Sequence, residues 1–323
     1  MTTAAITTYE IAVVVPTYRR ADALTRLLDA LAEQTLDPER WELVVVDDCS
    51  NQADVDEVLS DLAGRMPCAA RALRTPDNGG PAVARNIGWR ATGAPVIAFL
   101  DDDVLPDPIW LEAGLAAFDD EGVGVVQGRT VAPDGVDVHA QPAWSLWHVI
   151  DEAGPFFQSC NIFYRRAALE PTTGFDEQLA WWGEDTTLGW QVVEAGWARA
   201  FAPKANAIHE VEVRGPGWFI RNGWREHHVI ALAARHPGYR AEAFWRPWAF
   251  RKRDAAFVVA VTSGLIGLRW RPAWLGVLPY LWWGRPSVRH RRFLRVCAET
   301  AAVDAARSAG HLAGAVHHRV LVV

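Results

Sequence analysis

The chain has few cysteines and no basic excess. The four cysteines, Cys49, Cys68, Cys160 and Cys297, lie far apart and form no Cys-x-x-Cys pair. This excludes a zinc cluster or a disulfide framework and favours a reducing compartment. The net charge of −7 argues against a nucleic-acid-binding protein, which normally carries a basic excess. The opening residues MTTAAITTYE lack a basic region followed by an apolar one, so we expect no signal peptide.

Glycine-rich phosphate-binding motifs are also missing. The sequence contains no Gly-x-Gly-x-x-Gly, and residues 78–81 (Asn-Gly-Gly-Pro) are not a Walker sequence. Dehydrogenases and phosphate-loop enzymes are therefore disfavoured. We find no internal repeat and no low-complexity segment.

Short apolar runs alternate with helical patterns in the first third of the chain. Residues 11–16, 41–46 and 95–100 are β-branched or apolar runs, which predict buried strands. Residues 23–34, 55–64 and 82–91 between them have helical character. This order predicts an α/β fold whose mostly parallel, Rossmann-like sheet is flanked by helices.

Each of these strands ends in polar residues. The ends carry Pro16-Thr17-Tyr18, Asp47-Asp48 and Asp101-Asp102-Asp103. Ligands of open α/β sheets bind beyond the carboxyl ends of the strands. We therefore expect these three segments to lie around one ligand.

Three adjacent carboxylates at a strand end predict a metal site. Like charges repel unless a cation neutralises them, and oxygen ligands suit Mg²⁺ or Mn²⁺. The alternative for residues 101–103 is a solvated acidic turn. Asp47 and Asp48 can accept hydrogen bonds from a base or ribose, and the alternative for them is a helix or turn cap.

Six segments in order resemble the family-2 glycosyltransferases of GT-A fold. They are VVVPTYRR (13–20), VVVDDCS (44–50), DNGGPAVARNIG (77–88), FLDDDV (99–104), GFDE (174–177) and GEDTTLGW (183–190). They cover roughly residues 11–210. The resemblance implies a GT-A domain at residues 1–215, with a nucleotide-sugar half at about 1–110 and an acceptor half at about 111–215.

The resemblance also implies roles for individual residues. A nucleotide-sugar site would be lined by Pro16, Thr17, Tyr18, Arg20, Asp47, Asp48, Asn78, Gly79, Arg85, Asp101 and Asp102. The metal, Mn²⁺ or Mg²⁺, would be bound by Asp103, Asp101 and His209, and Asp185 would be the catalytic base. For His209 the alternative is an ordinary hydrogen-bonded histidine, and for Asp185 a carboxylate favoured by a helix dipole.

An inverting transfer needs a carboxylate that takes the acceptor proton and a Lewis acid for the departing diphosphate. The implied activity is transfer of a hexose or pentose from a nucleotide diphosphate sugar, of UDP or dTDP type, to a glycan or lipid-linked acceptor. Trp181, Trp182 and Glu184 are the candidate acceptor residues. The Gln-x-x-Arg-Trp motif of processive synthases is missing, so we expect single additions. Gln191 stands where relatives often have arginine.

The last third of the chain is rich in tryptophan and arginine. Residues 251–298 hold ten Lys/Arg against one acid, a net charge of +9 that leaves −16 for the rest. Two apolar runs, 255–268 and 273–283, are each shorter than the ~20 residues that span a bilayer. We expect a helical region at 216–323 that contacts the cytoplasmic face of the inner membrane peripherally through residues 251–295. The alternative is a tryptophan-rich helical subdomain or a dimer interface.

Two other functions remain open. A nucleotidyltransferase would also combine a nucleotide fold with metal-binding aspartates, but residues 13–20 are not its glycine-rich basic loop. A catalytically silent sugar-nucleotide-binding scaffold would be expected to have lost residues 101–103 or 183–185, and both segments are intact.

Overall fold

The computed structural model describes residues 9–137, 144–179, 182–283 and 293–322. The chain divides into two compact units. Unit 1 comprises Met1–Asp134 and His148–Glu210, and unit 2 comprises Gly135–Trp147 and Val211–Val323. The boundary between them is therefore not a single point in the sequence.

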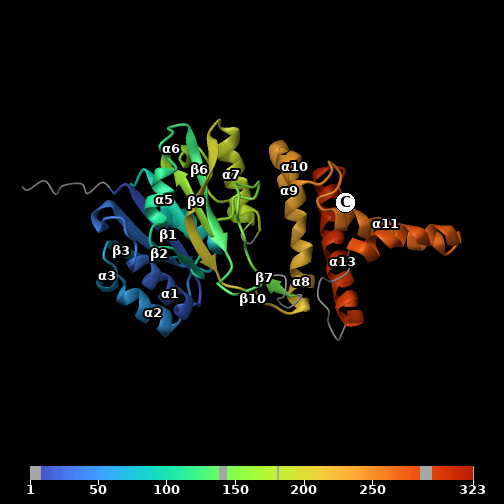
Figure 1. Ribbon diagram of the computed structural model, residues 1–323, viewed down its shortest axis with the longest axis horizontal. Coiled ribbons are helices and arrows are strands. Elements are labelled where there is room, and N and C mark those ends of the chain that lie inside the picture. The colour runs from blue at the N-terminus through green and yellow to red at the C-terminus, as the bar shows by residue number, and fades with distance from the viewer. Residues whose placement is uncertain (1–8, 138–143, 180–181, 284–292, 323) are drawn as a thin grey trace, which may run out of the picture. The chain divides into compact units, whose positions relative to one another are not determined.

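Among the described residues of unit 1, eight strands form one sheet in the order β3-β2-β1-β4-β8-β6-β9-β5 (Figure 1). The strands are β1 (Ile11–Thr17), β2 (Trp41–Asp47), β3 (Ala69–Arg74), β4 (Val96–Leu100), β5 (Val104–Pro106), β6 (Val123–Val131), β8 (Asn161–Arg165) and β9 (Ala198–His209). Strands β3, β2, β1 and β4 are mutually parallel, and β8 pairs antiparallel to β4 and β6. The predicted α/β fold with a mostly parallel sheet is confirmed.

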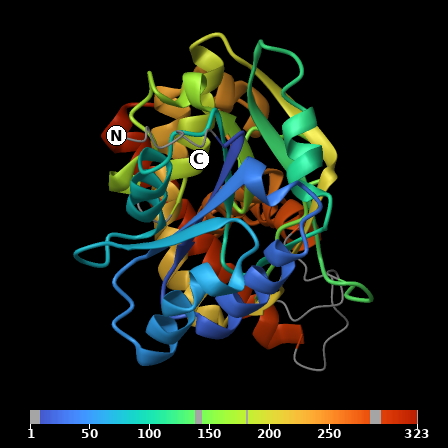
Figure 2. The ribbon, with the colours of Figure 1, turned by 90° about the vertical axis from the view of Figure 1, so that its left-hand side faces the viewer.

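Helices cover both faces of this sheet. They are α1 (Ala21–Ala32), α2 (Ala53–Ser60), α3 (Leu62–Arg65), α4 (Pro81–Arg90), α5 (Trp110–Ala116), α6 (Arg166–Leu169) and α7 (Glu184–Glu194). Short 3₁₀ turns lie at η1 (Pro38–Arg40) and η3 (Glu177–Leu179). Helices α1 to α3, drawn in blue, gather at the lower side of unit 1 in both ribbon views (Figures 1 and 2).

The alternation of strand side chains explains this layering. Val13 and Val15 of β1 share a core with the leucines of α1, whereas Val44 and Val46 of β2 pack under Ala84 of α4. Successive side chains of a strand point to opposite faces, so strands that are apolar throughout serve both layers. Helix α4 lies close to the sheet because it has a glycine, Gly88, over Val14.

Unit 2 is mainly helical. Its elements are the β7 (Ser145–Leu146) and β10 (Glu212–Val213) pair, α8 (Pro216–Gly223), η4 (Trp224–Glu226), α9 (His227–Arg235), α10 (Pro237–Ala243), α11 (Lys252–Gly267), η5 (Arg271–Val277), α12 (Leu278–Trp283) and α13 (Phe293–His318). Helix α13 packs against α8 and α9. Gly310 allows this approach, since a Cβ there would lie 2.6 Å from the carbonyl oxygen of Trp224.

The two apolar runs of the sequence lie in this unit. Residues 255–268 fall in α11, and residues 273–283 form η5 and α12. No helix within the described residues combines the length and apolar character needed to cross a bilayer.

Candidate active site

Three strand ends of unit 1 bring the predicted ligand-binding segments together. Thr17 lies opposite Asp47 in the β1–β2 register, and the Asp48 amide donates to the Thr17 carbonyl at 2.9 Å. Strand β4, which ends at Leu100 before the three aspartates, pairs with the other side of β1. The first, second and fourth strands therefore deliver their polar ends to one edge of the sheet, as the sequence predicts.

Asp47 and Asp48 organise the loops around this edge. The Asp47 carboxylate is fully buried and accepts bonds from Arg74 Nε at 2.7 Å and the Ser50 amide at 3.0 Å. Asp48 accepts bonds from the amides of Gly79 and Gly80 at 3.0 and 2.7 Å. Gly80 has a φ of 88°, a left-handed conformation that glycine adopts without strain.

Asn78, Pro16 and Tyr18 complete this side of the site. The side-chain amide of Asn78 donates to the Asp48 carbonyl at 3.3 Å, which holds Asn78 next to Asp48. Pro16 lies in β1 opposite Val46. Tyr18 is half-buried, and the Arg19 guanidinium lies 5.0 Å from the centre of its ring.

Asp102 is the most buried of the three adjacent aspartates. It accepts a bond from Thr17 Oγ1 at 2.8 Å and pairs with Arg20 at 3.2 Å. Burial, reinforced by the neighbouring Asp103, raises the pKa of Asp102 to about 7, and Arg20 only partly opposes this. Arg20 also pairs with Asp103 at 2.6 Å, so one guanidinium holds two of the carboxylates.

A buried arginine joins the other aspartate to helix α7. Arg85 is 3% exposed, and its guanidinium donates to Asp101 at 2.5 Å and to Glu184 at 3.2 Å. Although burial opposes it, Arg85 lowers the pKa of Asp101. Residues of three separate sequence motifs are thus held in one ion-paired chain.

Asp185 lies at the first turn of α7, next to Glu184. Gly183 precedes the helix with a φ of 87°, which permits the sharp entry into the turn. The carboxylate accepts bonds from the Ser159 amide at 3.2 Å and the Thr186 amide at 2.6 Å. Burial raises the pKa of both Glu184 and Asp185, and for Glu184 the adjacent Asp185 charge adds to the effect.

His209 ends β9 beside Asp103, because β9 returns antiparallel to β5 with Val104 opposite His209. His209 Nδ1 lies 2.7 Å from the Glu210 carbonyl oxygen, and a carbonyl only accepts. Nδ1 therefore carries a proton, and the other ring nitrogen, Nε2, lies 3.8 Å from Asp103 Oδ1.

A backbone-oriented imidazole with a free Nε2 beside carboxylates is the arrangement of a metal-binding histidine. The donor chemistry of Asp103 and His209 thus fits a divalent cation, although no group of three such side chains is arranged as a complete metal site within the described ranges.

Two residues of this site carry no signal in the sequence. His148 packs its ring 4.8 Å from that of His209, between centroids. His148 also helps to lower the pKa of the Asp101 carboxyl, but less than Arg85 and His209 do. Cys160 is buried near Asp101, Asp185 and Asp103, and burial raises its pKa well above the usual range, so the thiol stays protonated. Isolated residues in irregular segments such as 147–160 cannot be assigned to a site without tertiary contacts.

The candidate acceptor residues differ in their surroundings. Trp182 is half-buried and donates its amide to the Leu179 carbonyl at 2.8 Å, whereas Glu184 is 7% exposed against Arg85. Trp181 lies outside the described residues. The segment before them is fixed by Asn86, whose side chain bonds both the amide and the carbonyl of Phe175 at 3.0 and 2.8 Å.

Comparison with known proteins identifies the class. Residues 12–173 match the model of Glycosyl transferase family 2. The pre-mycofactocin glycosyltransferase of Mycobacterium tuberculosis is 30% identical over 245 residues, which are 71% of this chain and 48% of the relative. The validoxylamine A glucosyltransferase of Streptomyces hygroscopicus subsp. limoneus is 42% identical over 219 residues, 56% of this chain and 47% of the relative.

A solved structure shares the fold. The mannosyltransferase PcManGT from Pyrobaculum calidifontis, in complex with GDP-Man and Mn²⁺, superposes with a TM-score of 0.63 at 21% identity, over 93% of this chain and 87% of that one. The chain therefore belongs to glycosyltransferase family 2 and has the GT-A fold. It spans about half the length of the curated relatives that it matches.

Proposed function

We propose that the chain transfers a single sugar, with inversion, from a nucleotide diphosphate sugar to an acceptor hydroxyl. The observation that carries this proposal is the meeting of Asp185, the Asp101–Arg85–Glu184 chain and the Asp103–His209 pair at one edge of the sheet. A base, a set of fixed carboxylates and a cation-binding pair are the groups that such a displacement requires.

Asp185 takes the proton of the acceptor hydroxyl as its oxygen attacks the anomeric carbon. The two amides of Ser159 and Thr186 fix the carboxylate, and its raised pKa makes it a stronger base than a free aspartate. One in-line displacement inverts the anomeric centre, so no enzyme nucleophile is needed. Glu184 then has a positioning role through Arg85, since it is 7% exposed and accepts a bond from that guanidinium.

The donor is held at the ends of β1 and β2. Thr17, Tyr18, Asp47 and the Asn78–Gly79 loop would border the base and ribose, as the resemblance to the family implies. Asp103 and His209, with Asp101, would hold Mn²⁺ or Mg²⁺, which when bound neutralises the departing diphosphate. PcManGT binds GDP-Man and Mn²⁺. We therefore add GDP sugars to the UDP and dTDP sugars expected from the sequence as candidate donors.

The acceptor is a glycan or a lipid-linked hydroxyl at the cytoplasmic face of the inner membrane, and the transferred sugar is a hexose or pentose. The basic, tryptophan-rich residues 251–295 support a peripheral contact of the chain with anionic lipid. The division into a GT-A domain at 1–215 and a helical region at 216–323 belongs to the same proposal.

Isothermal titration calorimetry with UDP, GDP, dTDP and CDP, with and without Mn²⁺, tests the donor site. We expect one nucleotide to bind and its affinity to fall sharply on chelation. Absence of binding to every nucleotide would overturn the proposed donor class and favour a scaffold that does not use nucleotide sugars.

Asp185→Asn tests the base. The variant should bind the same nucleotide with unchanged affinity while hydrolysis of the donor sugar, followed without acceptor, falls by about 10² or more. Asp29→Asn is the matched control, because Asp29 is an exposed carboxylate on α1 paired with Arg65. Equal turnover by Asp185→Asn and Asp29→Asn would remove Asp185 from the mechanism.

A further inference from the structure

In one part of unit 2, exposed large apolar side chains are concentrated in a short stretch of the described chain. Helix α11 and the η5–α12 segment fold against each other as a hairpin, residues Lys252–Trp283, hereafter the α11–α12 arm. Small residues close it: a Cβ at Gly267 would lie 2.7 Å from Trp274 Nε1. The rings of Phe257 and Tyr280 meet at 5.2 Å between centroids.

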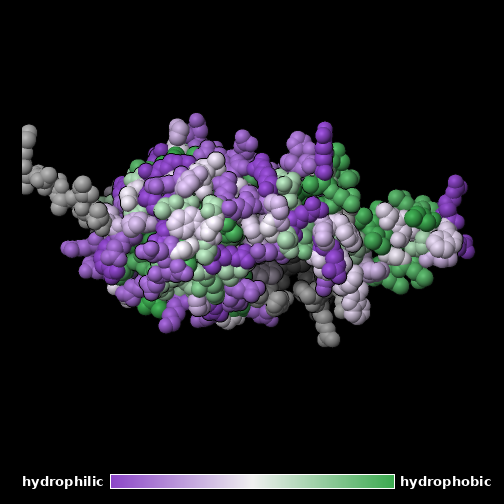
Figure 3. Space-filling view, turned by 90° about the horizontal axis from the view of Figure 1, so that it is seen from above, coloured by the Kyte–Doolittle hydropathy of each residue, from purple (hydrophilic) through white to green (hydrophobic). Residues whose placement is uncertain are grey.

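The outer surface of the arm is apolar. Among the residues the structure describes, twenty-three large hydrophobic side chains are exposed, and twelve of them lie between Val259 and Trp283. Leu265, Leu268 and Leu275 are 64%, 75% and 68% exposed. Figure 3 shows this concentration as the green surface at the right-hand end of the view. A cluster of exposed apolar side chains such as this one marks a site of interaction.

The apolar side chains leave α11 on several sides. At 3.6 residues per turn, Val261 points about 200° and Leu265 about 240° around the helix from Val259. All three are exposed. Together with the exposed side chains of η5 and α12, they form a surface broader than the single stripe that one partner helix would cover. A lipid interface accommodates such a broad apolar surface.

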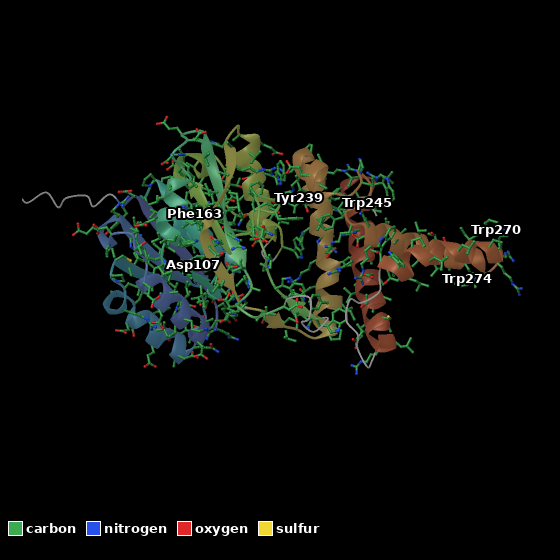
Figure 4. All side chains as sticks on the ribbon, in the orientation of Figure 1. Asp107, Phe163, Tyr239, Trp245, Trp270 and Trp274 are labelled. Carbon is green, nitrogen blue, oxygen red and sulfur yellow. The ribbon has the colours of Figure 1, made fainter. Side chains whose placement is uncertain are left out.

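Charge selects the kind of lipid and the orientation of the arm. Residues 255–283 contain no acid; Arg269 lies in the exposed turn between α11 and η5, and the exposed Arg271 begins η5. Trp270 and Trp274 lie at this same end of the arm (Figure 4). Arginine and tryptophan together are typical of the headgroup region of a membrane.

The length of the arm disfavours deep insertion with its tip foremost. The 16 residues of α11 span roughly 24 Å, less than the ~30 Å hydrocarbon core. Inserted endwise, the arm would leave Arg269 and Arg271 inside the hydrocarbon core, roughly 6 Å short of its far edge, where a charge is still costly. Lying in the plane of the interface keeps them among the headgroups while the leucines enter the acyl region.

Buried ion pairs fix the base of the arm to the body of unit 2. Asp304 of α13 accepts from Arg253 at 2.8 Å and from the Tyr280 hydroxyl at 2.6 Å, so both helices of the arm are tied to one carboxylate. Arg251 pairs with the buried Glu226 at 3.0 Å. These contacts attach the base of the arm to the body of unit 2.

We propose that the α11–α12 arm is a monotopic anchor that lies in the plane of an anionic bilayer, with Arg269 and Arg271 on the lipid phosphates and its exposed leucines in the acyl region. This deepens the peripheral contact of the proposed function by naming its site, geometry and lipid. It does not depend on the transfer reaction.

Vesicle flotation of the full chain tests the anchor. Wild type should bind phosphatidylcholine vesicles weakly and bind vesicles that also contain phosphatidylglycerol at least about tenfold more tightly. The triple variant Leu265→Ser, Leu268→Ser, Leu275→Ser should lose binding to both. The variant Arg269→Glu, Arg271→Glu should lose the preference for phosphatidylglycerol.

The matched control is Leu312→Ser, Val316→Ser on α13, because these side chains are 62% and 72% exposed but lie outside the arm. It should bind vesicles as wild type does. Equal binding by wild type and the triple variant would overturn the inference. The inference would also be overturned if the wild-type protein binds no vesicle and forms a dimer that the triple variant does not form. That outcome would favour an interface between copies of the chain.

Quenching by brominated lipids tests the geometry. The fluorescence lost on changing Trp270 and Trp274 to phenylalanine isolates their signal, which should be quenched more by bromine near the headgroup than by bromine near the chain end. The opposite order would refute the in-plane arrangement. Nucleotide titration of the same variants separates the two proposals: vesicle binding without nucleotide binding would leave the anchor standing and the donor site disproved.

Discussion

The proposed base, Asp185, makes a pH dependence of turnover in one direction an expected outcome. As a base it accepts a proton only when deprotonated, and burial raises its pKa above the usual aspartate value. The acid limb of kcat/KM should therefore lie at higher pH than for a free aspartate. The measurement is donor hydrolysis against pH, and an acid limb at the ordinary aspartate value would contradict the raised pKa of Asp185.

Arg85 is the residue whose loss should cost most stability in this site. Arg85→Met leaves Asp101 and Glu184 without their shared cation in a buried setting. Removal of one partner from a buried ion pair destabilises by about 3–5 kcal/mol. The control Arg40→Met breaks a pair with Glu10 that is half-exposed on both sides, where solvent screening leaves little stability to lose. Urea unfolding measures both, and similar losses would contradict the bridging role.

At the scale of the element, helix α4 depends on a missing side chain. A Cβ at Gly88 would lie 2.3 Å from Val14 Cγ1 and 3.1 Å from Val46 Cγ2, both in the sheet. Gly88→Ala should therefore push the helix from the sheet and destabilise unit 1 by about 1–3 kcal/mol. Gly93→Ala is the control, because nothing lies within 4 Å of its Cβ position. Thermal denaturation compares them, and equal melting temperatures would show that α4 adjusts freely.

The sequence could predict the buried strands but not the edge strands. β1, β2 and β4 are buried throughout and mostly apolar because helices cover both of their faces. β3 (AARALR) is half-exposed at the edge of the sheet, so its composition has no strand signal. β5 has three residues and exists through its pairing with β9. Long-range pairing leaves no local pattern in the sequence.

The same limit applies to the candidate site. The strand-end aspartates and Asp185 could be selected from their positions in short motifs. The link from Arg85 to Glu184 joins residues 99 positions apart, and His148 meets His209 only through the tertiary fold. The motifs therefore identify the charged side chains of the site, whereas the partners of these side chains and the shifts of their pKa values are found only in the structure.

At the scale of the whole molecule, charge is segregated along the chain. Residues 251–298 carry +9 within a protein of net charge −7. Binding to anionic vesicles should therefore weaken steeply as salt rises, because the Debye length falls from ~10 Å at 0.1 M to ~3 Å at 1 M. Weak binding to phosphatidylcholine vesicles should barely change. Flotation across a salt series measures this, and salt-independent binding to anionic vesicles would mean that apolar insertion alone attaches the protein.

The path of the chain between the two units also constrains how the gene can be divided. The segment Gly135–Trp147 leaves unit 1, supplies β7 to unit 2, and returns at His148, the histidine beside His209. A chain truncated after Glu210 would therefore still contain part of unit 2, because it would keep β7 and lose its partner strand β10. Separate expression of unit 1 needs a short loop grafted between Asp134 and His148. Any exchange of C-terminal regions between relatives must likewise carry both segments together.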